Sequence, residues 1–143
     1  PLLAEDGKLA EASYRRRIVH YVEDNDTNAE VMRGILAQRP QIQLEISSTG
    51  LDGLAAIRVE RPSLVLLDMH LPDIDGLELL RHLKADDSTA DIPVVVVSAD
   101  ATSARIREAM AAGAAQYLTK PVNVGEILAV LDEQLQAQDT RFG

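Results

Sequence analysis

The chain has 143 residues, a length that fits one domain, and its content of 46% hydrophobic and 26% charged residues excludes wholesale disorder. It contains no cysteine, so disulfide scaffolds, thiolate metal sites and thiol catalysis are excluded. Fourteen basic residues against 23 acidic ones give a net charge of −9, which argues against a nucleic-acid-binding surface because such a surface needs a basic face.

The two ends of the chain read differently from its middle. Residues 1–16 mix small, charged and polar side chains without a sustained period, and we interpret them as a linker or tail. Residues 17–138 are predicted to form one domain, and residues 139–143 a C-terminal tail. No apolar run approaches the roughly 18 residues that cross a bilayer, and the first residues do not form a signal peptide. We therefore expect a cytoplasmic protein without membrane insertion.

Five apolar runs of strand length follow one another along the middle of the chain. Two of them, LVLL and VVVV, are continuous rather than alternating, which is typical of strands covered on both faces. The predicted strands are Ile18–Val22, Ile42–Ile46, Leu64–Leu67, Val94–Val97 and Gln116–Leu118.

Helical spacing of apolar residues predicts a helix after each strand. The clearest stripe runs through residues 124–135 and is preceded by Asn123, with Glu126 three residues later, an arrangement typical of a capping box. The weakest stripe lies around Leu51–Val59 and is expected to end at Pro62. The other three helices are marked by residues 31–36 (ending near Pro40), 77–83 and 106–110 (closed by Gly113).

Five successive strand–helix units predict a parallel sheet with right-handed crossovers and helices on both faces. In such sheets, ligands bind outside the carboxyl ends of the strands, at the point where the strand order reverses. The residues that directly follow the predicted strands are therefore the first candidates for a functional site.

Charged and hydroxyl side chains stand at four of these strand ends. Glu23 and Asp24 follow the first strand, Asp68 follows the third, Ser98 follows the fourth, and Lys120 comes shortly after the fifth. Carboxylates brought so close together would repel one another unless a cation lay among them, and an all-oxygen site suits Mg²⁺. A carboxylate beside a divalent ion, an ammonium and a hydroxyl can accept a phosphoryl group. The sequence therefore predicts a Mg²⁺-dependent site that can form an aspartyl phosphate.

Four motifs give the chain a specific resemblance to the receiver domain of two-component response regulators. They are HYVEDNDTN (20–28), LVLLDMHLPDIDGLELL (64–80), IPVVVVSAD (92–100) and GAAQYLTKP (113–121). The resemblance covers about residues 17–138. It implies a flavodoxin-like, doubly wound (βα)5 fold with a five-stranded parallel sheet and helices on both faces.

The resemblance also implies roles for individual residues around the metal. Asp68 matches the phospho-acceptor, and Asp24 would ligate Mg²⁺ together with it. Glu23 stands at the first acid of the family's acidic pair, where Asp is commoner, and would act through a metal-bound water. His70 would supply its backbone carbonyl to the metal.

Three further residues match the family's catalytic and switch positions. Lys120 would pair with a phosphoryl oxygen, and Ser98 would hydrogen-bond another one. Tyr117 matches the switch aromatic whose rotamer follows the hydroxyl. The Lys120-Pro121 peptide bond resembles the cis bond of the family.

The function that this resemblance implies is that of a phosphorelay receiver. A phosphohistidine on a sensor histidine kinase or on a histidine phosphotransfer protein would donate to Asp68, and the change would alter the face formed by the fourth helix, fifth strand and fifth helix. A homodimer through the same face is the other candidate partnership, and no direct binding of nucleic acid is expected. The first residue is Pro1 rather than Met, and the C-terminal receiver of a hybrid histidine kinase is one expected context. The domain would catalyse its own phosphorylation and dephosphorylation without being an independent turnover enzyme.

Other functions remain open at this point. A degenerate receiver would act only as a docking or dimerisation module, and Mg²⁺ affinity would separate it from a phosphorylated one. An aspartate-based phosphohydrolase usually carries a second acid two residues after the nucleophile, where this chain has His70. A nucleotide- or flavin-binding module is disfavoured because EDNDTN, and no glycine-rich loop, follows the first strand.

Overall fold

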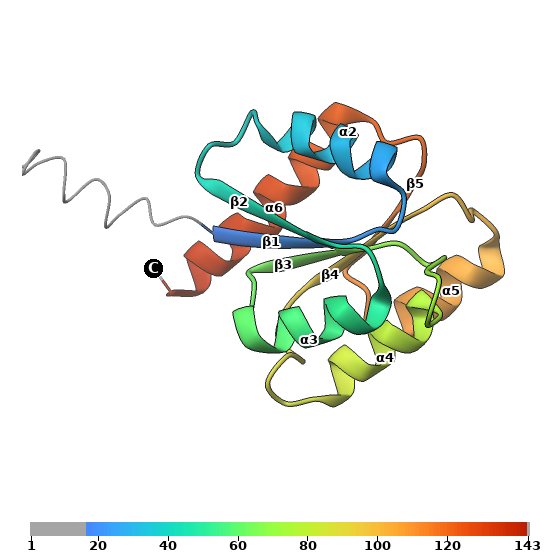
Figure 1. The fold of residues 1–143 in the computed structure, drawn as a ribbon. Coiled ribbons are helices and arrows are strands. Elements are labelled where there is room, and N and C mark those ends of the chain that lie inside the picture. The colour runs from blue at the N-terminus through green and yellow to red at the C-terminus, as the bar shows by residue number, and fades with distance from the viewer. Residues whose placement is uncertain (1–16, 143) are drawn as a thin grey trace, which may run out of the picture.

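The computed structural model describes residues 17–142, in which five parallel strands form one sheet between two layers of helices (Figure 1). The strand order across the sheet is β2-β1-β3-β4-β5. The strands are β1 (Arg17–Val22), β2 (Ile42–Ser47), β3 (Leu64–Leu67), β4 (Val94–Ser98) and β5 (Gln116–Thr119). The predicted flavodoxin-like fold is confirmed, and each predicted strand is found to within one residue at either end.

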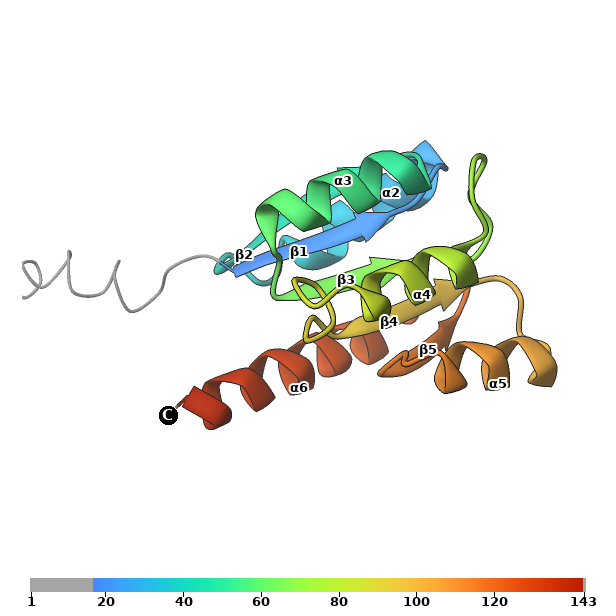
Figure 2. The ribbon, with the colours of Figure 1, turned by 90° about the horizontal axis from the view of Figure 1, so that it is seen from below.

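The helices divide unequally between the two faces of the sheet. Helices α2 (Asp26–Leu36) and α6 (Val124–Phe142) cover one face. Helices α3 (Gly50–Glu60), α4 (Gly76–Ala85) and α5 (Ser103–Ala111) cover the other, and they lie nearest the viewer when the molecule is seen from below (Figure 2). Helix α6 includes residues 139–142, which the sequence interpretation placed in a tail, so the domain limit at 138 stays a prediction.

Two separate apolar clusters explain why the central strands are hydrophobic without interruption. Leu64 and Leu66 of β3 point toward α2 and α6, while Val65 and Leu67 point toward the three helices of the opposite face. All four side chains are at most 1% exposed. Because a strand alternates its side chains, a strand that is buried on both faces needs an apolar residue at every position.

Side chains of polar residues fix the beginnings of four helices. Asn25, Thr49, Thr102 and Asn123 each accept a hydrogen bond from a backbone N–H in the first turn of the helix that follows. These are the residue types that satisfy otherwise unpaired N–H groups at a helix start. Asp75, at the start of α4, makes no such bond. The weakly patterned α3 is present, and Arg61 ends it one residue before Pro62 with a φ of 51°.

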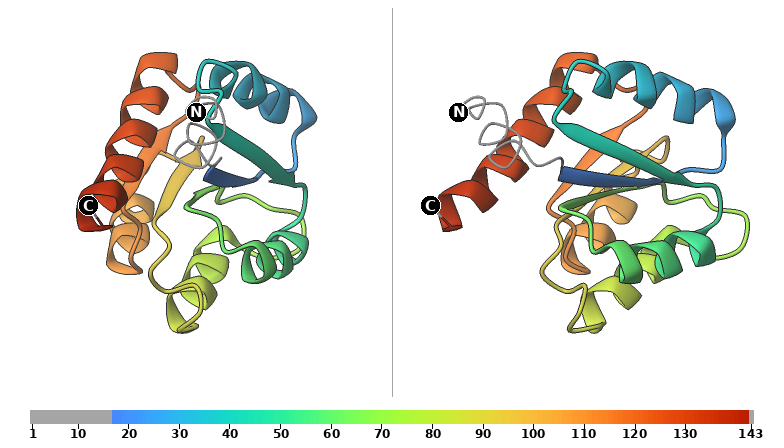
Figure 3. Two further views of the ribbon diagram at one scale, coloured as in Figure 1. Left: turned by 90° about the vertical axis from the view of Figure 1, so that its left-hand side faces the viewer. Right: turned by 60° about the vertical axis from the view of Figure 1, so that its left-hand side comes forward.

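The topology brings the ends of β1 and β3 together. The chain passes from β1 outward to β2 and then returns to place β3 on the other side of β1, so the strand order reverses between β1 and β3. Figure 3 shows the strands crossing the molecule between the two helix layers. Residues that follow β1 and β3 therefore lie side by side at the place where sheets of this kind bind ligands.

No helix within residues 17–142 is both long and apolar enough to cross a membrane.

Two glycines in helices should respond oppositely to alanine. A Cβ at Gly76 would lie 2.5 Å from the backbone oxygen of Asp68, whereas a Cβ at Gly34 would meet nothing within 4 Å. We expect Gly76→Ala to lower the free energy of unfolding by about 1–3 kcal/mol, because backbone must shift to admit the methyl group. Gly34→Ala should raise it by about 0.5–1 kcal/mol, since alanine loses less conformational entropy in a helix. Urea denaturation of both variants checks the pair, and equal effects of one sign would contradict the packing described.

Candidate functional site

Asp68 directly follows β3, so its carboxylate lies at the carboxyl end of the central strand. The residue is only 5% exposed, and its Oδ1 accepts a hydrogen bond from the backbone N–H of His70 at 3.3 Å. Its own N–H continues the sheet by donating to the Val22 carbonyl at 3.1 Å. Gly76 packs against the Asp68 carbonyl so closely that a side chain there would overlap it. The backbone of Asp68 is therefore fixed by β1 and by Gly76, and the His70 N–H orients its carboxylate.

Glu23 follows β1 and is fixed by three donors. Its Oε1 accepts hydrogen bonds from the Tyr21 hydroxyl at 2.8 Å and from Lys120 Nζ at 2.6 Å, and its Oε2 accepts one from the Asn25 N–H at 3.1 Å. The residue is 2% exposed. Buried carboxylates are costly unless they are paired and hydrogen-bonded. Here each oxygen has a donor, so the burial of Glu23 is compensated.

Three carboxylates gather at this point. Glu23, Asp24 and Asp68 each offer an oxygen, and these oxygens lie within 4.8 Å of one another. Glu23 and Asp68 are buried, whereas Asp24 is exposed. An all-oxygen donor set that is open to solvent on one side fits Mg²⁺, which keeps several waters and binds carboxylates. The residues present therefore fit the metal that the sequence predicts.

Lys120 controls the electrostatics of the two buried carboxylates. Its Nζ lies 2.6 Å from Glu23 Oε1 and 3.3 Å from Asp68 Oδ2. Burial raises the pKa of Asp68, with Glu23 adding to the rise and Lys120 opposing it. At Glu23 burial also acts to raise the pKa, but the hydrogen bonds from Lys120, Tyr21 and Asn25 outweigh it and the pKa lies below its usual value. Of these two buried carboxyl groups, Asp68 is therefore the one that binds a proton more readily.

Ser98 and Tyr117 meet through a third residue, Asp100. Ser98, at the end of β4, is fully buried, and its Oγ accepts a hydrogen bond from the Asp100 N–H at 3.2 Å. The Tyr117 hydroxyl donates to the Asp100 carbonyl. Burial raises the pKa of Tyr117. The backbone of one residue thus holds both of the predicted switch groups.

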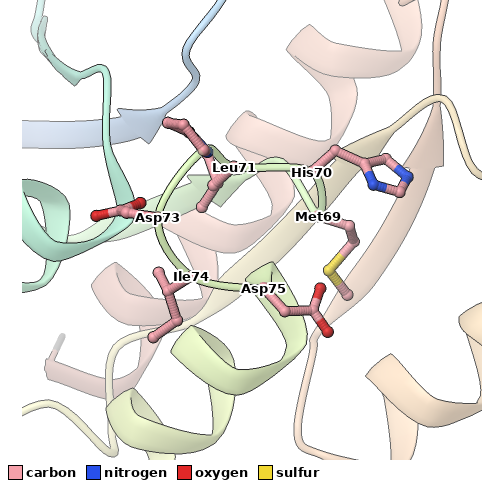
Figure 4. A pocket seen from close by; sticks show the side chains of 7 residues that line it. Met69, His70, Leu71, Asp73, Ile74 and Asp75 are labelled. Atoms are coloured by element: carbon pink, nitrogen blue, oxygen red, sulfur yellow. The ribbon is translucent and has the colours of Figure 1, made fainter.

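The loop that follows Asp68, residues 69–75, lines a hollow of about 380 Å³. Figure 4 shows its side chains spread to opposite sides, with Asp73 directed toward α3 and His70 and Asp75 on the other side. The Asp73 carboxylate accepts hydrogen bonds from the N–H groups of Gly50 and Leu51 at 2.8 and 2.9 Å. This loop is therefore attached to the first turn of α3.

The structure brings most of the predicted site residues together. Asp24, Asp68 and Glu23 form the acidic cluster, Lys120 contacts two of its members, and the Lys120-Pro121 bond is cis as expected. The His70 ring is 64% exposed, and its Nε2 lies 3.9 Å from Asp100 Oδ2. The catalytic, metal-binding and switch roles of these residues stay predictions.

Sequence reasoning missed two residues of the site. Tyr21 lies two positions before Glu23, and residues two apart in a strand share one side of the sheet, so this spacing could have indicated the contact. Asp100 contacts the site through its backbone N–H and carbonyl, and no sequence pattern signals such a role.

Comparisons with known proteins point to one family. The profile of the response regulator receiver domain matches residues 19–132. DivK of Brucella anthropi, a polar-differentiation response regulator, is 32% identical over 82% of this chain and 94% of its own length. CseB of Streptomyces coelicolor, a transcriptional regulatory protein, is 37% identical over 87% of this chain, which spans about half of that relative. A CheY-like receiver domain from Methanospirillum hungatei superposes with a TM-score of 0.79 at 30% identity, covering 88% of this chain and 98% of that one.

The raised pKa of Asp68 predicts that this carboxylate destabilises the fold at neutral pH. A carboxyl whose pKa is higher in the folded state favours folding when protonated, and that contribution is lost as the pH rises through the raised pKa. We expect Asp68→Asn to raise the free energy of unfolding at pH 7, in buffer free of divalent cations, by the roughly 0.5–2 kcal/mol usual for stabilising substitutions.

The gain should shrink as the pH falls toward and below the ordinary aspartate value of 3.8, where the wild-type carboxyl becomes neutral too. Asp87→Asn is the matched control. Asp87 is exposed, and its substitution removes the same charge from a loop away from the site. Urea titrations at several pH values measure both. A gain that is independent of pH, or one equal to that of the control, would contradict the assignment.

Proposed function

Because the chain belongs to the response regulator receiver domain family, we propose that it accepts a phosphoryl group on Asp68 and changes a partner-binding face in response. The observation that carries this proposal is the position of the Asp68 carboxylate. It stands at the reversal point of the sheet, in an acidic cluster, with Lys120 Nζ 3.3 Å away. A nucleophilic oxygen, a metal-binding set and a fixed cation are thereby within a few ångströms of one another.

The phosphoryl donor that suits this site is a phosphohistidine on a sensor histidine kinase or a histidine phosphotransfer protein. An Asp68 oxygen attacks phosphorus, the P–N bond breaks, and the imidazole nitrogen keeps the electron pair of that bond. The acceptor must be ionised to attack, and Lys120 favours this form by opposing the effect of burial on the Asp68 pKa. The Lys120 ammonium, 3.3 Å from Asp68 Oδ2, is also placed to pair with a phosphoryl oxygen on Asp68. Phosphoryl transfer needs little from a protein beyond such positioning and charge stabilisation.

Mg²⁺ would be held by the carboxylates of Asp24 and Asp68, by the His70 carbonyl, and by Glu23 through a water. When bound, the ion neutralises negative charge on the phosphoryl oxygens and orients them. The His70 N–H donates to Asp68 Oδ1, which fixes the geometry of the backbone on which that carbonyl lies. Glu23 is immobilised by Tyr21 and Asn25 as well as by Lys120, so it can hold a water at a defined place.

The response would begin at Ser98. A phosphoryl group brings about −1.5 to −2 charges to Asp68 and offers new acceptors to the Ser98 hydroxyl. The Ser98 oxygen now accepts from the Asp100 N–H, so a shift of Ser98 toward the phosphoryl group would draw Asp100 with it. Tyr117 is bonded to the carbonyl of the same residue, so the displacement of Asp100 also frees the aromatic ring. The face made by α5, β5 and α6 would change as a consequence, and a partner or second copy would bind there.

Substitution of the acceptor tests the chemical proposal directly. We expect Asp68→Asn to abolish Mg²⁺-dependent incorporation of phosphate from a small acyl phosphate such as acetyl phosphate. Asp87→Asn should be labelled as the wild type is, because Asp87 lies in an exposed loop away from the site. Phosphate-affinity electrophoresis or intact-protein mass spectrometry measures the outcome. Persistent labelling of Asp68→Asn would refute the acceptor assignment. No Mg²⁺ binding by the wild type at millimolar concentration would instead favour a docking module.

Replacing Lys120 should separate metal binding from phosphorylation. The ammonium lies 2.6 and 3.3 Å from two carboxylates of the cluster, where it opposes the arrival of a second cation. We expect Lys120→Met to bind Mg²⁺ more tightly, and yet to be phosphorylated about 10²–10³-fold more slowly, the usual cost of removing one group that stabilises transition-state charge. Lys120→Arg, which keeps the charge, is the control. Calorimetry measures the Mg²⁺ affinity, and labelling kinetics measure the phosphorylation rate. A fall in both quantities would contradict this account.

A further inference from the structure

An ion pair joins two residues that do not follow the usual preferences at helix starts. Asp75 occupies the position before α4 where an aspartate usually accepts a hydrogen bond from the first turn, yet its side chain makes no such bond. Arg105 stands in the first turn of α5, where a positive charge is disfavoured by the helix dipole and no acidic residue is present. The two side chains pair with each other instead.

The Arg105 guanidinium joins three segments. Besides Asp75, its Nε lies 3.9 Å from Asp100 Oδ2, and its Nη1 lies 3.7 Å from Glu108 Oε1 of the same helix. The Arg105 side chain is only 19% exposed. Asp75 closes the loop that begins at Asp68, and Asp100 lies in the segment between Ser98 and α5. One side chain therefore connects the acceptor loop, the segment after β4 and the start of α5.

Asp100 is the point at which this connection reaches the switch groups. Its carboxylate accepts hydrogen bonds from the N–H and hydroxyl of Thr102 at 3.1 and 2.9 Å, so Asp100 is tied to the residue that caps α5. Its backbone N–H donates to Ser98, and its carbonyl accepts from Tyr117. These bonds link the position of Ser98 to the segment 99–102 and, through Thr102, to the first turn of α5.

We propose that the Arg105–Asp75 ion pair is a clasp that holds α5 and Asp100 in the resting arrangement and opposes the movement of Ser98 toward a phosphoryl group. Arg105 is a positioning residue in this scheme, and the inference rests on the proposed function of Asp68. An interaction made in one arrangement of a two-state element favours that arrangement by as much as it is weakened in the other. The clasp would therefore set how readily phosphorylation switches the domain.

The test uses the binding of beryllofluoride, a mimic of the phosphoryl group, in the presence of saturating Mg²⁺. We expect Arg105→Ala to bind it about two- to fivefold more tightly than the wild type, the range that a partly exposed ion pair can supply. Asp75→Asn should have the same effect, and asparagine is also a favourable residue before a helix, so this variant guards against a folding defect. The double variant should gain no more than either single one.

The matched control is Arg107→Ala, because Arg107 is exposed on the same helix and makes no ion pair with the side chains described, those of residues 17–138. It should bind beryllofluoride as the wild type does, and Mg²⁺ affinity should be unchanged in all variants. An NMR measurement separates positioning from a purely structural role. In Arg105→Ala without beryllofluoride, we expect the Asp100 amide resonance to shift along the line that joins its free and beryllofluoride-bound positions in the wild type. A purely structural role would not produce a shift along that line.

The outcomes separate the two proposals. If the wild type binds beryllofluoride and Arg105→Ala binds it no more tightly than Arg107→Ala, the clasp is wrong and the proposed function stands. Additive gains in the double variant would also overturn the clasp, because independent effects do not arise from one shared contact. If the wild type binds no beryllofluoride, the proposed function is overturned and the clasp with it.

Discussion

The contact between the Lys120 ammonium and two buried carboxylates is the interaction on which the site depends. It joins the ends of β1, β3 and β5 through side chains, with Glu23 and Asp68 as the partners. Two buried carboxylates this close together would tend to take up a proton if no cation lay among them, and a protonated Asp68 could not attack phosphorus. The pKa of Asp68 is still raised, so the compensation is incomplete, and this chain keeps an energetic cost at the place where chemistry is expected.

Much of the fold could be predicted because burial leaves a simple record in the sequence. β3 is apolar at every position, and β4 is apolar from Val94 to Val97, because both strands pack on both helix layers. Uninterrupted apolar strands of this kind indicate a sheet that is covered on both faces, as parallel sheets are. The position of the acidic cluster followed from topology, since the ends of parallel strands meet at one edge. Helix α3 was the hardest to recognise, because Leu51 and Val59 are exposed and blur the apolar stripe.

The contacts that could not be predicted depend on side-chain directions rather than residue types. Asp75 has the sequence context of a helix cap, and nothing before the structure suggests that it turns toward Arg105, thirty positions along the chain. Asp100 acts through its backbone, which every residue possesses. Tyr21 is the intermediate case, because strand alternation places it beside Glu23 but does not say that its hydroxyl reaches the carboxylate.

The placement of the tyrosines has a practical consequence. The chain has three tyrosines and no tryptophan, so no indole would mask the ultraviolet emission of the phenol rings. Tyr21 donates to a carboxylate of the acidic cluster, and Tyr117 donates to the Asp100 carbonyl, next to the predicted switch hydroxyl of Ser98. The molecule therefore carries two native fluorescent side chains next to its candidate site, one beside the acidic cluster and one beside Ser98 and Asp100, without any attached dye.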